Sequence, residues 1–345
     1  MLKILNTLDR RWIFLAMGLA IAVPILVIGL TGKTFPETPT KQAQDAFDTI
    51  ENLPDGSMVL ITFDFDPASA GELTPMATSM VRHCALKNHL IYLCALWPLG
   101  TQMAEDAANR VLVADFPQYR YGENWLNLGF QAGNEVVMKQ MLGDVKGAFP
   151  KDSKGTATSR IPMMQAIGRI TDFNAMLNIS AGYPGAKEWV LYVAGPNRTG
   201  PKPMRMVAGC TGVQTQQLYP YYPTQMDGLL AAIKGAAEYE TLVNRKAAQM
   251  LRPALEKALA AAKLDPGLAD LPGQLAAWSF VGADKVTDPA LKAEVQRVAR
   301  QLTDPKYMEA QRRMGPQLFA HLLMVLLIIL GNVVFFANRR KGGRA

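Results

Sequence analysis

The chain has 345 residues, of which 49% are hydrophobic and 19% charged, with 36 Lys and Arg against 29 Asp and Glu. This apolar content excludes an intrinsically disordered chain, and 3 cysteines exclude a disulfide-stapled scaffold. The net charge of +7 does not indicate a nucleic-acid partner, because most of the excess cations lie in the terminal tails, residues 1–12 and 338–345.

An uncharged apolar run, Ile13–Leu30, follows the N-terminal tail. It is long enough to cross the hydrocarbon core of a bilayer as a helix. The run ends in Val-Ile-Gly-Leu-Thr-Gly-Lys, which is a poor match to the A-x-A-like pattern of a signal-peptidase site. The pattern therefore predicts an uncleaved signal anchor over residues 13–31, rather than a secretory signal that is removed.

A second apolar run, Leu318–Ala337, lies near the C-terminus and predicts a second transmembrane helix over residues 318–337. Its polar residue Asn332 has two interpretations. A polar side chain inside a span often contacts a neighbouring helix, so Asn332 is a candidate interface residue. A position close to the headgroups explains the same residue equally well.

The flanking charges predict the orientation of both helices, because Lys and Arg near the ends of spans favour the cytoplasmic side. Both tails are rich in cations and poor in acids, and their cations are Lys3, Arg10, Arg11, Arg339, Arg340, Lys341 and Arg344. We therefore expect both termini in the cytoplasm and residues 32–317 on the outer side of a cell (inner) membrane. In a bacterium that side is the periplasm or the cell surface.

The segment between the two apolar runs divides into three parts. A linker with a short helix occupies residues 32–57, an α/β domain residues 58–245, and an Ala-rich helical stalk residues 246–317. The α/β domain is predicted from five continuous apolar stretches, at residues 58–65, 89–97, 125–130, 173–180 and 205–211.

Helical patterns separate these five strands, at residues 74–87, 101–115, 133–149 and 187–193, and the Val and Tyr content of the last also fits a strand. A further pattern over residues 223–263 predicts one long helix, or two that break near Pro253. Continuous apolar strands that alternate with helices are typical of a doubly wound, mostly parallel sheet of about five strands. A flavodoxin-like core and a periplasmic-binding-like core both fit this pattern.

Ligands of such sheets bind at the carboxyl ends of the strands, and three strand ends carry candidate residues. The first contributes Asp64, Asp66 and Ser69. Alternation along the strand places both carboxylates on one face, where they could hold Mg²⁺ or Ca²⁺ or act as nucleophile and acid. In the structural alternative, Asp66 starts a turn and Asp64 accepts hydrogen bonds from nearby backbone N–H groups.

The spacing of Asp64 and Asp66 resembles the D-x-D motif of haloacid-dehalogenase-like phosphatases, and Asp284 and Asp288 loosely match the later acidic motif of that family. The resemblance covers only these few positions. Ala68 stands where the family usually has Thr or Val, and the second acidic motif contains an extra residue. The resemblance implies a metal-dependent hydrolase, with Asp64 and Asp66 as weak metal candidates.

The other two strand ends offer backbone, hydroxyl and aromatic groups. Gly182 and Tyr183 follow the fourth strand, and Thr211 and Gln214 follow the fifth. A loop with three tyrosines comes next, and these either line a pocket or interface, or cover the edge of the sheet. They are Tyr219, Tyr221 and Tyr222.

Small residues along the predicted helix from residue 223 form a candidate subunit interface, or pack on the domain's own sheet. The interface candidates among them are Gly228, Ala232 and Gly235. No catalytic residue is assigned and no cofactor is expected, because the sequence has no P-loop, serine-hydrolase or zinc motif. Cys84 and Cys94 either form a disulfide or stay as buried thiols.

The arrangement of anchor, outer α/β domain and anchor resembles the auxiliary subunits of some ABC-type gliding or export systems, an analogy of architecture alone. We therefore predict a non-enzymatic membrane subunit that assembles with other membrane proteins, with further copies of itself, or with both. The alternatives are an anchored ligand-binding or sensor domain and a metal-dependent hydrolase.

Overall fold

The computed structural model describes residues 9–32, 34–35, 37–199, 202–261 and 287–342. The chain divides into two compact units. One unit holds both terminal segments, residues 1–36 and 311–345, and the other holds residues 37–310.

The larger unit contains a six-stranded, all-parallel sheet whose strand order is β3-β2-β1-β4-β5-β6. The order reverses between β1 and β4, and this is the position at which doubly wound sheets bind ligands. The strands are β1 Met58–Asp64, β2 Leu90–Ala95, β3 Trp125–Phe130, β4 Ala175–Ser180, β5 Arg205–Cys210 and β6 Gly228–Ala231.

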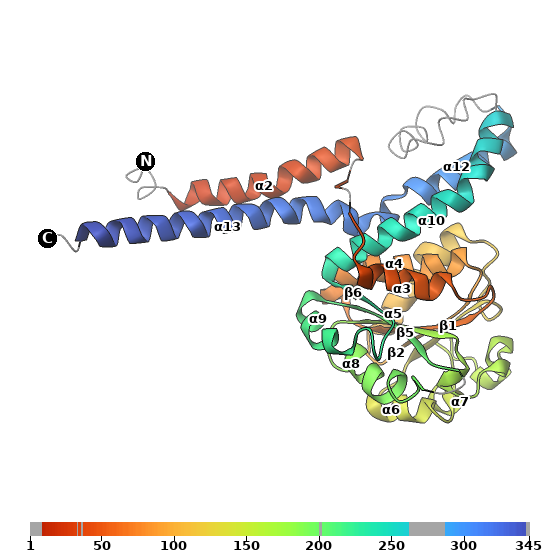
Figure 1. Ribbon diagram of the computed structural model, residues 1–345. Coiled ribbons are helices and arrows are strands. Elements are labelled where there is room, and N and C mark those ends of the chain that lie inside the picture. The colour runs from red at the N-terminus through yellow and green to blue at the C-terminus, as the bar shows by residue number, and fades with distance from the viewer. Residues whose placement is uncertain (1–8, 33, 36, 200–201, 262–286, 343–345) are drawn as a thin grey trace. The chain divides into compact units, whose positions relative to one another are not determined.

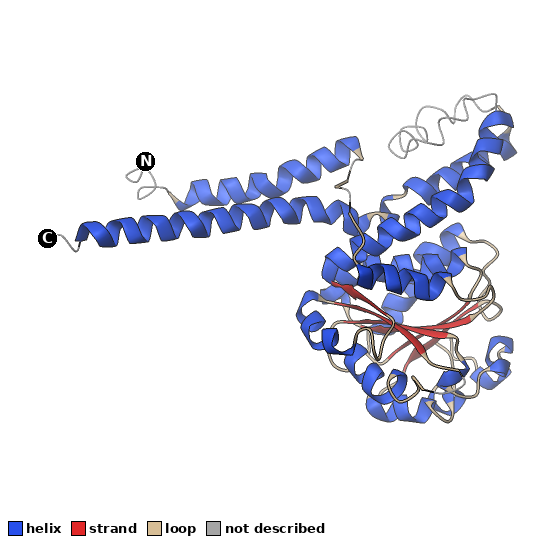
Figure 2. Cartoon of the chain, in the orientation of Figure 1, coloured by secondary structure: helices blue, strands red, loops and turns tan. Residues whose placement is uncertain are grey.

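Helices cover both faces of this sheet (Figures 1 and 2). On one face lie α3 Lys41–Glu51, α4 Ala70–Leu86, α5 Gly100–Ala108 and α10 Ala232–Ala261. The opposite face carries the shorter helices α6 Glu135–Met141, α7 Val145–Ala148, α8 Ala186–Trp189 and α9 Gly212–Leu218. Helix α12, Pro289–Thr303, packs on α10.

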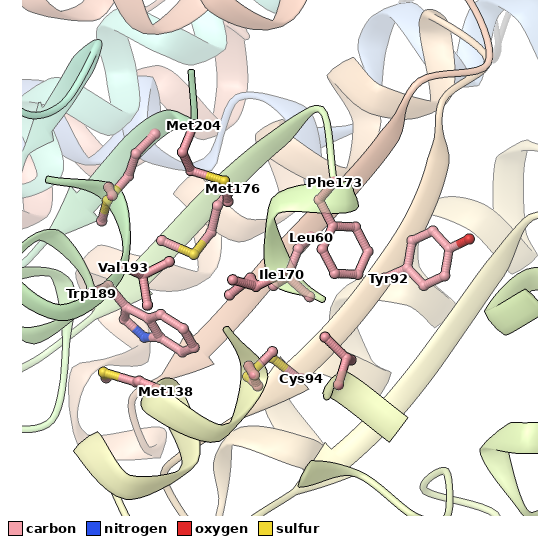
Figure 3. Packing of buried hydrophobic residues seen from close by; sticks show 14 of the residues in the cluster. Leu60, Tyr92, Cys94, Met138, Ile170, Phe173, Met176, Trp189, Val193 and Met204 are labelled. Carbon is pink, nitrogen blue, oxygen red and sulfur yellow. The ribbon is translucent and has the colours of Figure 1, made fainter. Parts of the chain in front are cut away.

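Burial on both faces explains why the strands are continuously apolar. All residues of β4 are buried, and only the first residue of β1 is partly exposed. A cluster of buried side chains lies between the sheet and α6–α9, with Trp189, Met138 and Val193 among its members (Figure 3). Cys84, Cys94 and Cys210 are all free and buried.

The α/β class and the five predicted strands are confirmed, but the prediction of a helix from Pro223 was wrong at its start. Residues Gly228–Ala231 form the sixth strand, and the helix begins only at Ala232. It then continues through Pro253 without a break. The stretch Gly212–Leu218 after the fifth strand, for which the sequence pattern predicted no helix, is helix α9.

Two parts of the predicted stalk, α12 and the second half of α10, are helical as expected. The apolar residues Trp278, Phe280 and Val281 of the stalk segment lie outside the described residues, as does Asp284.

The smaller unit contains α2, Arg10–Thr31, and most of α13, Glu309–Gly342. By length and composition, two helical segments are able to cross a membrane, one within Arg11–Thr31 and one within Gln296–Phe336. Asp9 caps the start of α2, and Gly32 ends it in the left-handed conformation.

Candidate functional site

Three of the predicted loops do leave the sheet at one edge. Asp64 at the end of β1 is in register with Ser180 of β4, and Ser180 is in register with Cys210 of β5. The loops that follow are therefore neighbours at the carboxyl edge, on both sides of the point where the strand order reverses. This edge is the candidate functional site.

Asp64 is fully buried, and both of its carboxylate oxygens accept hydrogen bonds. The backbone N–H of Leu96 donates to Oδ1 at 2.8 Å. Nδ2 of Asn178 and Nε1 of Trp189 each donate to Oδ2 at 2.7 Å. Because these donors come from the β2 loop, β4 and α8, the carboxylate links four elements of the fold at the end of β1.

Burial raises the pKa of Asp64 to about 6, because removal from water disfavours the charged form. The hydrogen bonds from Leu96, Trp189, Thr62 and Asn178 partly oppose this effect. A carboxyl that titrates near neutral pH suits general acid–base chemistry. Here, however, protein N–H groups occupy both oxygens, so neither faces a site that a substrate or a metal ion enters.

Asp66 and Ser69 do not join Asp64. Asp66 is half-buried, and its Oδ1 accepts a hydrogen bond from the backbone N–H of Ala68 at 3.0 Å, which caps the short turn Pro67–Ser69. The structure therefore gives the two carboxylates separate partners, as in the structural alternative. Among the described residues, no group of three or more His, Cys, Asp or Glu side chains could hold a metal ion.

The loops after β4 and β5 are bonded to each other. Ser180 Oγ donates to Gln214 Oε1 at 2.9 Å, and Gln214 Nε2 donates to the carbonyl of Gly182 at 3.0 Å. Thr211 is 8% exposed and Gln214 4%. The structure thus brings Gly182 and Gln214 together, but their polar groups form hydrogen bonds with each other and do not point into an open crevice.

Trp97 covers the end of β1. It follows β2, and its Nε1 donates to the carbonyl of Pro184, which follows β4, at 2.8 Å. Because β1 lies between β2 and β4 in the sheet, the indole passes over the strand end that carries Asp64. Side chains of the protein therefore fill the crevice at the end of β1, and open space remains beside Trp97.

The three tyrosines do not belong to this edge as a group. Helix α9 carries the chain back from the end of β5 towards the start of β6, so the loop after it lies towards the opposite edge. There the hydroxyl of Tyr222 donates to Asp45 Oδ2 of α3 at 2.5 Å. Burial, and then Asp45, raise the pKa of Tyr222 to about 12. Tyr219 remains exposed and Tyr221 half-buried.

The candidate interface residues contact their own chain. Gly228 lies in β6, where a Cβ atom would come within 2.3 Å of Ala46 Cα in α3. A Cβ on Gly235 would come within 2.7 Å of the Leu230 backbone, and Ala232 is half-buried at positive φ. Asn332 Nδ2 donates to the carbonyl of Ile328 in the same helix at 3.0 Å.

Exposed apolar side chains surround the filled crevice. We call five of them the strand-end patch: Leu99, Phe130, Val136, Tyr183 and Val213. Val213 is 87% exposed, Val136 70% and Tyr183 59%, which leaves large apolar surface in water. A cavity of about 380 Å³ at the patch is lined by Trp97, Phe130, Asn134 and Tyr183, among others.

The sequence analysis missed Asn178, Trp189 and Trp97 as parts of this site. A signal for Asn178 exists, because Thr62, Asp64, Asn178 and Ser180 are polar residues at alternate positions of two apolar strands. Such a pattern places polar side chains on one buried face, where they need one another as partners. The sequence carries no comparable signal for the two tryptophans.

No family model matches the chain. Comparison with the curated proteins gives no match. Comparison with the solved structures gives none either.

Proposed function

We propose that the chain is a non-enzymatic, membrane-anchored subunit of a larger envelope or transport assembly, and that its strand-end patch binds a protein partner. The proposal rests on the contrast, at the carboxyl edge of the sheet, between a filled crevice and exposed apolar loops around it. The crevice that would hold a small ligand is filled by Asp64, Trp97 and Gln214, whereas the loops around it expose apolar side chains. Large exposed apolar side chains are typical of protein interfaces.

Membrane anchoring is part of the proposal. Helices α2 and α13 supply the two spans, and the cations that flank them favour cytoplasmic tails. The α/β domain then lies outside the cytoplasm. An even number of spans places both tails on the same side.

The narrower comparison with a flavodoxin-like or periplasmic-binding-like core is also a proposal. It is supported by the parallel sheet with helices on both faces. The observed strand order 3-2-1-4-5-6 differs from the flavodoxin order 2-1-3-4-5 and is that of the doubly wound dinucleotide-binding fold, so the support for a flavodoxin-like core ends at the parallel sheet. Neither order assigns a function.

A ligand-binding or sensor domain is the second candidate, favoured by the cavity of about 380 Å³ beside Trp97 and Tyr183. Aromatic side chains with a few polar neighbours are typical of small-molecule pockets. The metal-dependent hydrolase has less support, because N–H donors occupy both oxygens of Asp64 and Asp66 caps its own turn.

Native mass spectrometry of the full-length protein, extracted from its own cells in a mild detergent, tests the assembly. One chain has a mass of 37.7 kDa. We expect a heavier particle that contains at least one other membrane protein, because a partner bound at the strand-end patch should stay bound during mild extraction. A monodisperse particle with the mass of one chain would argue against a subunit role.

A further inference from the structure

An apolar groove runs along α2 in the smaller unit. It has a volume of about 560 Å³ and is lined by Ala20, Val23, Pro24 and Val27 of α2, together with Phe35 and Phe319. Almost all of its surface is apolar, and Leu19, which also lines it, is half exposed. The groove therefore suits a hydrocarbon chain and offers little to a polar ligand.

Two aromatic rings lie at the end of the groove that follows α2 in the chain. Phe35 and Phe319 meet edge to face, with ring centroids 6.0 Å apart. Beside them, a Cβ on Gly315 would come within 2.9 Å of the Phe35 ring and 3.2 Å of Ile28. Away from this contact the groove extends along α2 to Leu19.

The length of the groove matches one leaflet of a bilayer. From Ile28 to Leu19 the rise of an α-helix is about 14 Å, and half of the hydrocarbon core is about 15 Å. The aromatic rings of Phe35 and Phe319 then lie near the interface, and Leu19 lies near the bilayer centre.

The cation of Arg312 lies beyond the end of the groove that Phe35 and Phe319 line. Arg312 precedes Gly315 by three residues and Phe319 by seven, so all three lie on one face of α13. Arg312 therefore projects from the helix face that lines the groove, about two turns beyond Phe319. A phosphate group at this level would meet a guanidinium, which binds phosphate through charge-assisted hydrogen bonds.

We propose that the groove binds one acyl chain of an anionic phospholipid, with the headgroup phosphate at Arg312. The inference rests on the membrane placement proposed above. A second copy of the chain is a weaker occupant, because Thr34 is the one polar side chain among the described lining residues, and its hydroxyl already donates to Gln311.

Native mass spectrometry of the full-length protein, released from vesicles of equal parts phosphatidylcholine and phosphatidylglycerol, tests the proposal. We expect one phosphatidylglycerol to remain on each chain after the bulk lipid is removed. Arg312→Gln should lower the preference for phosphatidylglycerol over phosphatidylcholine about fivefold, the effect of one cation near an anionic surface.

Two further variants separate the groove from the rest of the span. Ala20→Phe fills the groove and should abolish retention of either lipid. Leu326→Phe enlarges an exposed side chain of α13 outside the groove lining and should change nothing. Equal lipid retention by the wild type and by Ala20→Phe would overturn the proposal. Equal retention of phosphatidylglycerol and phosphatidylcholine by the wild type would also overturn it. So would a dimer of the wild type that Ala20→Phe dissociates, because the groove would then hold a second copy of the chain.

The membrane placement is checked separately, by resistance of the protein to alkaline extraction from membranes. A chain that resists extraction but retains no lipid contradicts the lipid site alone. A chain that is extracted contradicts the placement.

Discussion

Replacement of Asp64 by alanine should lower the free energy of unfolding by about 3–5 kcal/mol. The substitution leaves the N–H groups of Leu96 and Trp189 without their acceptor inside the protein, and it removes one of the two acceptors of Asn178 Nδ2. Urea unfolding of the full-length protein in mild detergent, followed by tryptophan fluorescence, measures the loss.

Asp66→Ala is the matched control. It removes a carboxylate two residues away that accepts one hydrogen bond in a half-exposed turn, so the expected loss is about 1 kcal/mol. Equal effects of the two substitutions would contradict the structural role assigned to Asp64.

The effect of Asp64→Ala should also depend on pH. The folded protein raises the pKa of Asp64 from 3.8 to about 6, so the protonated carboxyl is favoured in the folded state. Its stabilising contribution is fully present below the unfolded pKa and is lost as the pH rises through the folded pKa. The difference between wild type and Asp64→Ala should therefore be larger by about 2 kcal/mol at pH 4 than at pH 7. A difference that does not vary with pH would contradict the raised pKa.

Gly228→Ala should lower the free energy of unfolding by about 3 kcal/mol or more. The added Cβ would lie 2.3 Å from Ala46 Cα and 2.5 Å from Ala46 N, both of which belong to the backbone of α3. Backbone atoms cannot rotate away as a flexible side chain does, so β6 and α3 must separate. The same urea unfolding measurement detects this loss.

Gly71→Ala is the control for this substitution. Gly71 lies in α4 with nothing within 4 Å of its Cβ position. Because alanine is the better helix former, the substitution should raise stability by up to about 1 kcal/mol. A neutral Gly228→Ala variant would show that β6 does not pack closely on α3.

The sequence predicted most of the sheet because buried parallel strands are continuous apolar runs, and five of the six strands show this pattern. The sixth, Gly-Leu-Leu-Ala, is short and runs directly into α10. Its small and apolar residues fit a helix as well as a strand, and only its pairing with β5 decides between them.

The candidate site was only partly predictable. Alternation placed Asp64 at the carboxyl edge, but its partners come from distant parts of the chain, namely Leu96, Asn178 and Trp189. Whether a carboxylate at a strand end faces solvent or is satisfied internally depends on those partners. The local sequence pattern was enough to predict where the strands end. It could not predict that side chains from distant parts of the chain fill the crevice there.

The most direct test of the proposed function is site-specific photo-crosslinking in the cells that produce the protein. A photoreactive side chain replaces Val213 of the strand-end patch, and in the control it replaces Val113, which is 59% exposed but outside the patch. We expect position 213 to crosslink to one defined membrane protein and position 113 not to do so. Crosslinking from neither position, or the same products from both, would contradict a partner-binding role for the patch.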